Sequence, residues 1–263
     1  MKLEIITALE CGKNKDMVED ALSYHKKTKT FTLADGITKS SRSYLASNIA
    51  TTMIQQDLKS MQKELIKDNV LNDEDVLYLF EKIIKDTDKF IYEGSKNTFL
   101  KGTGTTIDAG IIHNHTFFYA HAGDGRIYLF RDGQLKQLTE DHILFPENIA
   151  EKDKETYALT GKLNNYVGRG DASVDTGKIK LKNNDIIWMQ TDGISKVLTN
   201  AELESHLNFF NNINFIIDKN KETPINQAMN YCNLFNNHKE IHNVYSKLKN
   251  DDKAYIGIKI TQK

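Results

Sequence analysis

The sequence predicts an α+β protein in which antiparallel β-sheets are covered by helices. Three observations lead to this prediction. Segments with the alternating period of a strand follow one another directly in the middle of the chain, two long helical segments precede them, and a last strand comes after a second helical region. A parallel sheet would need strands and helices in regular alternation, and the sequence lacks that order.

The first predicted elements are a strand, a polar loop and a second strand. Apolar and polar residues alternate around residues 3–7, as they do in a half-buried strand. The polar segment 11–21, with the sequence CGKNKDMVEDA, is predicted to be a loop. The segment 29–36, KTFTLADG, is predicted to be a strand that ends on an Asp-Gly pair.

Two long helices are expected next, over residues 43–66 and 73–93. In the second segment, acidic residues occupy the first turn, where they stabilise the positive end of the helix dipole. Apolar residues recur there at the spacing of one helix face. These residues are Val76, Leu79, Phe80, Ile83 and Ile84.

Three consecutive strands are predicted over residues 105–113, 116–124 and 126–133, because the period of the apolar residues changes to two. The last of them ends on the Asp-Gly pair at 132–133, which is a strong hairpin signal.

The rest of the chain is predicted to contain fewer regular elements. We expect a loop-rich stretch over 141–181, a buried strand over 184–193, helices with breaks over 200–250 and a final strand over 254–261.

Composition favours one domain over residues 1–263, since only two prolines occur and no linker or internal repeat is visible. A hydrophobic share of 39% is enough for a core.

The formal charge of −1 argues against a dedicated nucleic-acid binder. The cysteines Cys11 and Cys232 are too few for a disulfide scaffold and fit a reducing cytosol. Since neither a signal peptide nor a membrane span is visible, we expect a cytoplasmic protein without membrane partners, and a monomer.

Carboxylates recur at the ends of the predicted strands. Asp35, Asp124 and Asp192 each follow an apolar run and precede a glycine. An acidic side chain at the mouth of a buried strand loses water and needs a compensating positive charge. Hard divalent cations such as Mg²⁺ and Mn²⁺ meet that need with oxygen ligands. Two such ions about 3.5–4 Å apart share a bridging water and activate it for attack on phosphorus.

The same pairs also have a plain structural interpretation, because Asp-Gly is a common tight turn for backbone reasons alone. The pair at 132–133 is interpreted as such a turn. The metal hypothesis therefore depends on the whole ordered set of acids, which also includes Glu19-Asp20 before a strand and Asp251-Asp252 before the last strand.

Taken in order, six segments of the sequence resemble the type 2C metal-dependent Ser/Thr protein phosphatases, in a divergent, bacterial-type form. The resemblance covers nearly the whole chain and includes the two helices between the second and third segments. The segments are VEDA at 18–21, FTLADG at 31–36, GTGTT at 102–106, AHAGDGRIYLFRDGQLKQLTEDH at 120–142, WMQTDGI at 188–194 and DDKAYIGI at 251–258.

The resemblance implies a four-layer αββα sandwich of two antiparallel sheets flanked by helices, with two Mg²⁺ or Mn²⁺ ions at one edge. It implies a protein-serine/threonine phosphatase that acts on phosphorylated proteins, in partnership with a cognate Ser/Thr kinase. A bridging hydroxide would attack the phosphate directly, without a phosphoenzyme.

Position by position, the resemblance also implies the roles of single residues. Asp35 would bridge both ions, and Asp192 would be its catalytic partner. The other implied ligands are Glu19, Asp20, the Gly36 carbonyl and Asp251, with Asp124 and Asp192 holding a third, weaker ion. Lys15 stands where the family often has an arginine that grips the substrate phosphate; its plain alternative is a solvated loop lysine.

Departures from the family leave two alternatives open. The chain reads DGITKSSRS from residue 35, without the His or Gly-Gly that often follows the metal-binding aspartate, so no histidine general acid is available there. A catalytically weak or inactive domain that binds phosphoproteins or regulates a partner is the first alternative. An enzyme that hydrolyses a small phosphate ester is the second.

Overall fold

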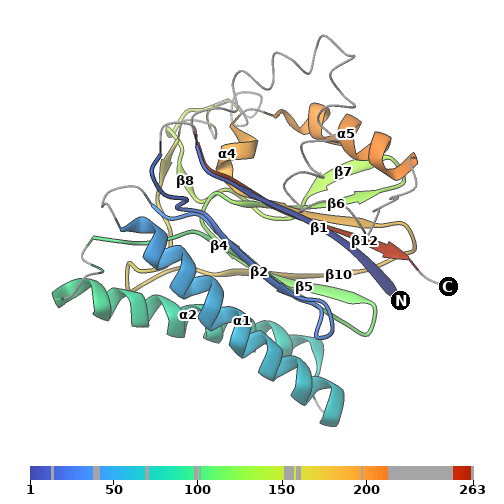
Figure 1. The fold of residues 1–263 in the computed structure, drawn as a ribbon, viewed down its shortest axis with the longest axis horizontal. Helices are drawn as coiled ribbons and strands as arrows, with labels where there is room; N and C mark the ends of the chain where they lie inside the picture. Colours follow the sequence, from blue (N-terminus) through green and yellow to red (C-terminus); the bar gives the residue numbers. More distant parts are fainter. Residues whose placement is uncertain are drawn as a thin grey trace.

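The computed structural model describes residues 1–12, 15–37, 42–68, 71–97, 100, 102–150, 157, 161–196, 198–212 and 251–261. In these ranges, two five-stranded sheets lie face to face between helices (Figure 1). The predicted αββα arrangement of antiparallel sheets is therefore confirmed. No helix in the described part of the chain is long and apolar enough to cross a membrane.

The first sheet has the strand order β1-β12-β11-β6-β7, and every neighbouring pair is antiparallel. Its strands are β1 (Lys2–Glu10), β6 (Arg126–Arg131), β7 (Gln134–Gln137), β11 (Ile186–Gln190) and β12 (Lys253–Thr261). The helices α4 (Asp192–Ser195) and α5 (Asn200–Asn212) lie on its outer side (Figure 1).

The second sheet has the order β10-β5-β4-β3-β2 and is also antiparallel throughout. Its strands are β2 (Ala21–His25), β3 (Thr30–Ala34), β4 (Ile107–His113), β5 (Thr116–Ala122) and β10 (Asp175–Lys180). The helices α1 (Ser43–Asp68) and α2 (Asp73–Asn97) cover its outer face (Figure 1).

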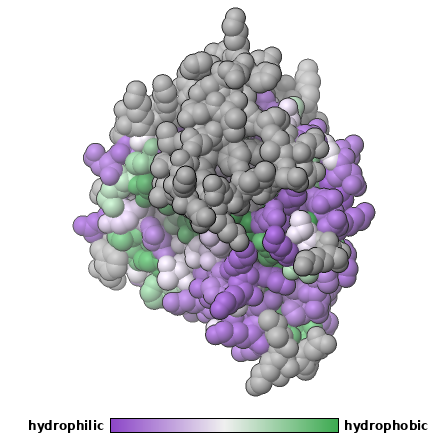
Figure 2. Space-filling view, turned by 45° about the vertical axis from the view of Figure 1, so that its right-hand side comes forward, coloured by the Kyte–Doolittle hydropathy of each residue, from purple (hydrophilic) through white to green (hydrophobic). Residues whose placement is uncertain are grey.

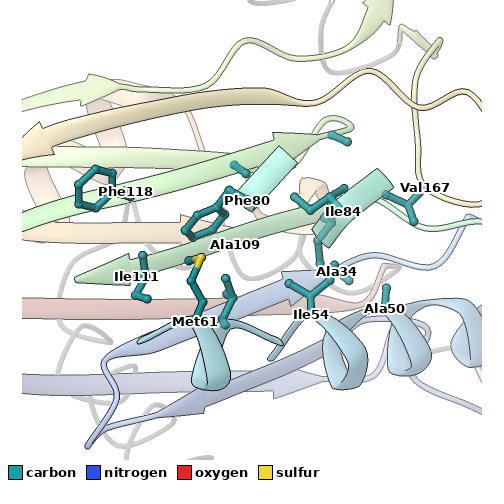
Figure 3. Packing of buried hydrophobic residues seen from close by; sticks show 14 of the residues in the cluster. Ala34, Ala50, Ile54, Met61, Phe80, Ile84, Ala109, Ile111, Phe118 and Val167 are labelled. Atoms are coloured by element: carbon teal, nitrogen blue, oxygen red, sulfur yellow. The ribbon is translucent and has the colours of Figure 1, made fainter. Parts of the chain in front are cut away.

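Helix α1 packs on this sheet through one buried stripe. Ala46, Ala50, Ile54 and Leu58 recur every four residues and are fully buried, so they lie on a single helix face. Figure 3 shows Ile54 and Ala50 of α1 facing Phe80 and the strands of the sheet. Each buried Ile or Leu contributes about 1.5–3 kcal/mol to stability.

The strand β11 explains why a continuous apolar run can lie in an antiparallel sheet. Ile187 and Met189 point into the layer between the two sheets, whereas Ile186 and Trp188 pack under α5. Both faces of this strand are covered, so no polar alternation is needed.

Some parts of the chain differ from the sequence predictions. The stretch 141–181, predicted to be loop-rich, contains β10 together with the short pair β8 (Ile143–Leu144) and β9 (Lys162–Leu163). β10 is an edge strand whose side chains are mostly partly or fully exposed, so its sequence, DTGKIK, lacks an apolar pattern. The predicted strand 184–193 ends at Gln190, because Asp192 begins the helical turn α4.

The predicted helices over 200–250 are confirmed as far as Asn212, and residues 213–250, with Cys232, lie outside the described residues. Polar side chains dominate the coloured surface in Figure 2. Large apolar side chains with high exposure are scattered over the described residues: Met17, Tyr24, Tyr78, Phe90 and Leu144.

Candidate metal centre

Strand register brings the predicted acids to one end of both sheets. Ala21 pairs with Ala34 across β2 and β3, so Asp20 and Asp35, the next residues on that side, lie next to each other. In the other sheet, Gln190 of β11 pairs with Tyr255 of β12, which places Asp192 beside the start of β12.

Asp124 reaches the same end from the turn between β5 and β6. The start of β6 pairs with the end of β11, because Arg126 lies opposite Gln190. Asp124 and Asp192 consequently act on each other electrostatically, and both act on Asp35. Four predicted ligands from distant parts of the sequence thus share one site.

Thr191 joins the two sheets inside this site. Its hydroxyl donates to Asp20 Oδ2 at 2.9 Å and accepts the backbone N–H of Ala254 at 3.0 Å. One side chain at the end of β11 thereby fixes a carboxylate of the second sheet and the backbone of β12.

The backbone of Asp35 is clamped by two threonines. The Asp35 N–H donates to Thr106 Oγ1 at 2.9 Å, and the Thr105 hydroxyl donates to the Asp35 carbonyl at 2.8 Å. Both threonines thus form hydrogen bonds where β3 ends. They fix the direction in which the Asp35 carboxylate points.

Three carboxylates in this site, those of Asp20, Asp35 and Asp124, resist ionisation. Burial, followed by the charge of Asp192, raises the pKa of Asp20 and that of Asp124 to about 7. Burial and the charges of Asp20, Asp192 and Asp124 hold the pKa of Asp35 well above its usual range. Several acidic groups therefore face one another with too little positive charge among them.

This donor set suits hard divalent cations, which carboxylate oxygens bind well and whose charge would lower all three of these pKa values. Within the described ranges, no three His, Cys, Asp or Glu side chains already have the spacing of a metal site. The ligands are gathered at the site, and side-chain adjustments are needed to close a coordination shell.

Glu19 and Asp251 lie beside this group, around Lys15. The Lys15 ammonium contacts Glu19 Oε2 at 2.8 Å, Asp251 Oδ1 at 3.0 Å and Asp252 Oδ2 at 3.1 Å. Lys15 is therefore held by carboxylates and is not a freely solvated lysine. Its predicted contact with a substrate phosphate stays a prediction.

Asp252 is a structural residue whose importance the sequence did not reveal. It is buried and accepts the backbone N–H groups of Gly12 at 2.7 Å and Glu19 at 2.8 Å. Asp251, by contrast, keeps 41% of its side chain exposed. The ligand role that the resemblance implies for Asp251 stays a prediction.

Glycine at 36 and at 193 is required by close packing. A Cβ at Gly193 would lie 1.9 Å from the Asp252 carbonyl oxygen, and one at Gly36 would lie 2.7 Å from the backbone of Ser43. The Gly36 N–H donates to the Glu19 carbonyl at 3.1 Å, which ties the Asp35 strand end to the loop that carries Glu19.

A polar layer supports the turn that carries Asp124. Arg126 forms a bidentate ion pair with Asp141, with Nη2 to Oδ2 at 2.7 Å. His142 Nδ1 accepts the N–H of Gly123 at 3.1 Å. Asp141 and His142 therefore hold the turn between β5 and β6 in place.

The pair of Asp108 and His121 was not predicted. His121 Nδ1 lies 2.7 Å from Asp108 Oδ1, and both side chains are fully buried. A Cβ at Gly125 would meet Asp108 Oδ2 at 2.2 Å, so this pair lies directly under the turn. Both residues occur within apolar strands, where the sequence pattern gives no sign of a polar pair.

Comparison with known proteins connects this geometry to one family. A family model described as "Protein phosphatase 2C" matches residues 10–230. The protein phosphatase PhpP of Streptococcus pneumoniae is 25% identical over 210 residues, which are 76% of this chain and 82% of that protein. The serine/threonine phosphatase stp of Listeria monocytogenes is 29% identical over 169 residues, covering 62% and 66%.

Solved structures agree on the fold. The serine/threonine phosphatase of S. agalactiae superposes with a TM-score of 0.75 at 20% identity, covering 99% of this chain and all of the other. The catalytic domain of the phosphatase PstP, solved in complex with two manganese ions, gives a TM-score of 0.72 at 16% identity over 99% of both chains.

Proposed function

This chain belongs to the protein phosphatase 2C family, and from that premise we propose that the carboxylates gathered at the sheet ends are the active site of a Ser/Thr phosphatase. The protein is a metal-dependent protein-serine/threonine phosphatase that hydrolyses phosphoserine and phosphothreonine in phosphoproteins. The observation that carries the site assignment is that Asp20, Asp35, Asp124 and Asp192 meet at one end of the sheets, where burial and neighbouring acids raise the pKa of the first three.

We assign the two Mg²⁺ or Mn²⁺ ions to Asp35, Asp192 and Asp251, to Glu19 or Asp20, and to the Gly36 carbonyl. When bound, the ions supply positive charge for the phosphate and a water activated for attack. The donor set fits them, because burial and neighbouring acids raise the pKa of Asp20, Asp35 and Asp124, and divalent cations would relieve that repulsion.

The chain's own residues hold this arrangement in place. Thr105 and Thr106 fix the Asp35 backbone, and Thr191 orients Asp20. Lys15 holds Glu19 and Asp251 toward each other and adds a positive charge near the expected phosphate position. A lysine there attracts phosphate as a point charge, without the bidentate fork of an arginine.

We further propose that residues 1–263 form one catalytic domain that acts as a monomer on the products of a cognate Ser/Thr kinase. The buried layer between the sheets supports the single domain, since it takes side chains from both of them, among them Phe31 of β3 and Ile187 of β11. The scattered exposed apolar residues support the monomer.

The assignment is tested by hydrolysis of a phosphothreonine peptide with and without Mn²⁺. We expect turnover only with the ion, and a loss on the order of a thousand-fold in an Asp35→Asn variant, because removal of one metal ligand costs several kcal/mol of transition-state stabilisation. Asp73→Asn, an exposed acid of α2, is the matched control and should keep full activity.

Two results would contradict the proposal. Metal-independent turnover would exclude the ions from the reaction. Mn²⁺ binding without any turnover would instead support the regulatory alternative, and faster hydrolysis of small phosphate esters than of the peptide would change the substrate class.

A further inference from the structure

Lys196 is a second lysine at the metal centre, and its backbone position is fixed by α4. Its N–H donates to the Asp192 carbonyl at 2.8 Å, so the single turn of α4 returns the chain to the face on which Asp192 lies. Residues four apart on a helical turn are neighbours, and the two side chains form an ion pair.

The ammonium of Lys196 serves several carboxylates at once. Besides its ion pair with Asp192 Oδ2, its Nζ lies 3.3 Å from Asp251 Oδ2. Its charge also acts on Asp124 and Asp35, where it opposes the mutual repulsion of the acids. The Lys196 side chain is 40% exposed, so packing does not confine it. Attraction to the carboxylates holds its ammonium in place.

We propose that Lys196 supplies, beside Asp192 and Asp124, the positive charge that a third metal ion would otherwise provide, so that this protein binds two ions and excludes a third. This inference rests on the ligand assignment of the proposed function. In it, the Lys196 ammonium takes the place of the third, weaker ion that the family resemblance implies. Lys196 is a positioning residue in this scheme, since it acts through the ligands.

The physical reason is competition for the same oxygen atoms. A divalent ion between Asp124 and Asp192 would lie close to an ammonium that already contacts Asp192 Oδ2. Like charges at such a distance repel strongly in a partly buried site. A third ion could enter only after the Lys196 ammonium had left Asp192. The protein would then lose the ion pair between these two residues.

The experiment counts bound ions in the full chain. The protein is stripped with a chelator, and Mn²⁺ binding is measured by equilibrium dialysis with elemental analysis and by titration calorimetry. We expect two Mn²⁺ per wild-type chain and three per Lys196→Gln chain, with the third site of the variant at least tenfold tighter than any third site of the wild type. Lys178→Gln, which removes the same charge from a surface pair with Asp73 and Glu74, should stay at two.

Two further variants locate the effect. Lys196→Arg keeps the charge and should keep two ions, and it also shows whether position 196 tolerates substitution if Lys196→Gln folds poorly. Asp124→Asn combined with Lys196→Gln should return the count to two, because the third ion loses a ligand.

The outcomes separate this inference from the proposed function. Three ions in the wild type, or two in a folded Lys196→Gln variant, would overturn the inference and leave a metal-dependent phosphatase intact. A wild-type chain that binds no Mn²⁺ would overturn both.

Discussion

At the scale of single residues, Thr191 has a structural role that the sequence pattern does not indicate. It is buried and bonds Asp20 on one side and the β12 backbone on the other. A threonine hydroxyl both donates and accepts, and this position uses both capacities.

Thr191→Val keeps the shape of the side chain and removes both hydrogen bonds. We expect a loss of about 1–3 kcal/mol of stability, because Asp20 and the Ala254 N–H lose a buried partner. Mn²⁺ affinity, measured by calorimetry, should fall with it. Thr191→Ser keeps the hydroxyl and should bind Mn²⁺ like the wild type. Wild-type stability and Mn²⁺ affinity in Thr191→Val would contradict the role of the hydroxyl.

Lys15 is expected to stabilise the metal-free protein through its ion pairs. Its ammonium is shared by Glu19, Asp251 and the buried Asp252, so Lys15→Gln leaves uncompensated charge in a partly buried place. We expect the unfolding free energy of the metal-free protein to fall by about 1–3 kcal/mol in chemical denaturation. Lys178→Gln is the exposed control. Unchanged stability would mean that the three contacts contribute little, as is common for surface ion pairs.

At the scale of elements, the junction of β11 with α4 decides where Asp192 points. The chain turns from strand to helix within one residue, and Gly193 packs against the Asp252 carbonyl at the start of β12. An Asp-Gly pair usually marks a tight turn. Here Gly193 instead provides the contact between two segments that are 59 positions apart in the sequence.

Gly193→Ala should therefore be severely destabilising, because its Cβ would overlap a backbone oxygen that cannot rotate away. Gly102→Ala is the contrast: that site is open, and only its φ of +72° opposes a side chain, at a cost of about 1–2 kcal/mol. Thermal unfolding followed by the fluorescence of Trp188, the single tryptophan, compares the two. Similar midpoints for both variants would contradict the close packing at Gly193.

At the scale of the whole molecule, the fold brings carboxylates together at the expense of its own stability until ions bind. The pKa of Asp20 and that of Asp124 are raised to about 7 by burial and neighbouring acids, from about 3.9 in an unfolded chain. Between these values the folded state binds more protons than the unfolded state. The unfolding free energy of the metal-free protein should consequently decrease as the pH rises toward and through 7.

We expect the thermal midpoint of the chelator-treated protein to be lower at pH 8 than at pH 6, by about 2–4 °C for each kcal/mol lost. Mn²⁺ should raise the midpoint more at pH 8, because it binds the ionised ligands. Burial lowers the pKa of His113 and His206, which acts in the opposite direction, so the difference between metal-free and Mn²⁺-loaded protein is the quantity to compare. An equal Mn²⁺ shift at both pH values would contradict the raised pKa values.

The sequence by itself determined the order of the main strands and helices and the set of acids at the strand ends. These features are local: alternation marks a strand, a four-residue spacing marks a helix face such as that of α1, and an acid before glycine marks a strand end. The edge strand β10 was missed because its half-exposed residues lack an apolar pattern.

Only the tertiary structure decided how those acids share the site. It buried Asp252 and left Asp251 accessible, paired Asp108 with His121, and placed Lys15 and Lys196 among the ligands. These relations join residues up to 240 positions apart, such as Gly12 and Asp252. They depend on strand register and on the stacking of two sheets, and the free energy of a buried charge is set by those distant neighbours and not by the residues beside it in the sequence.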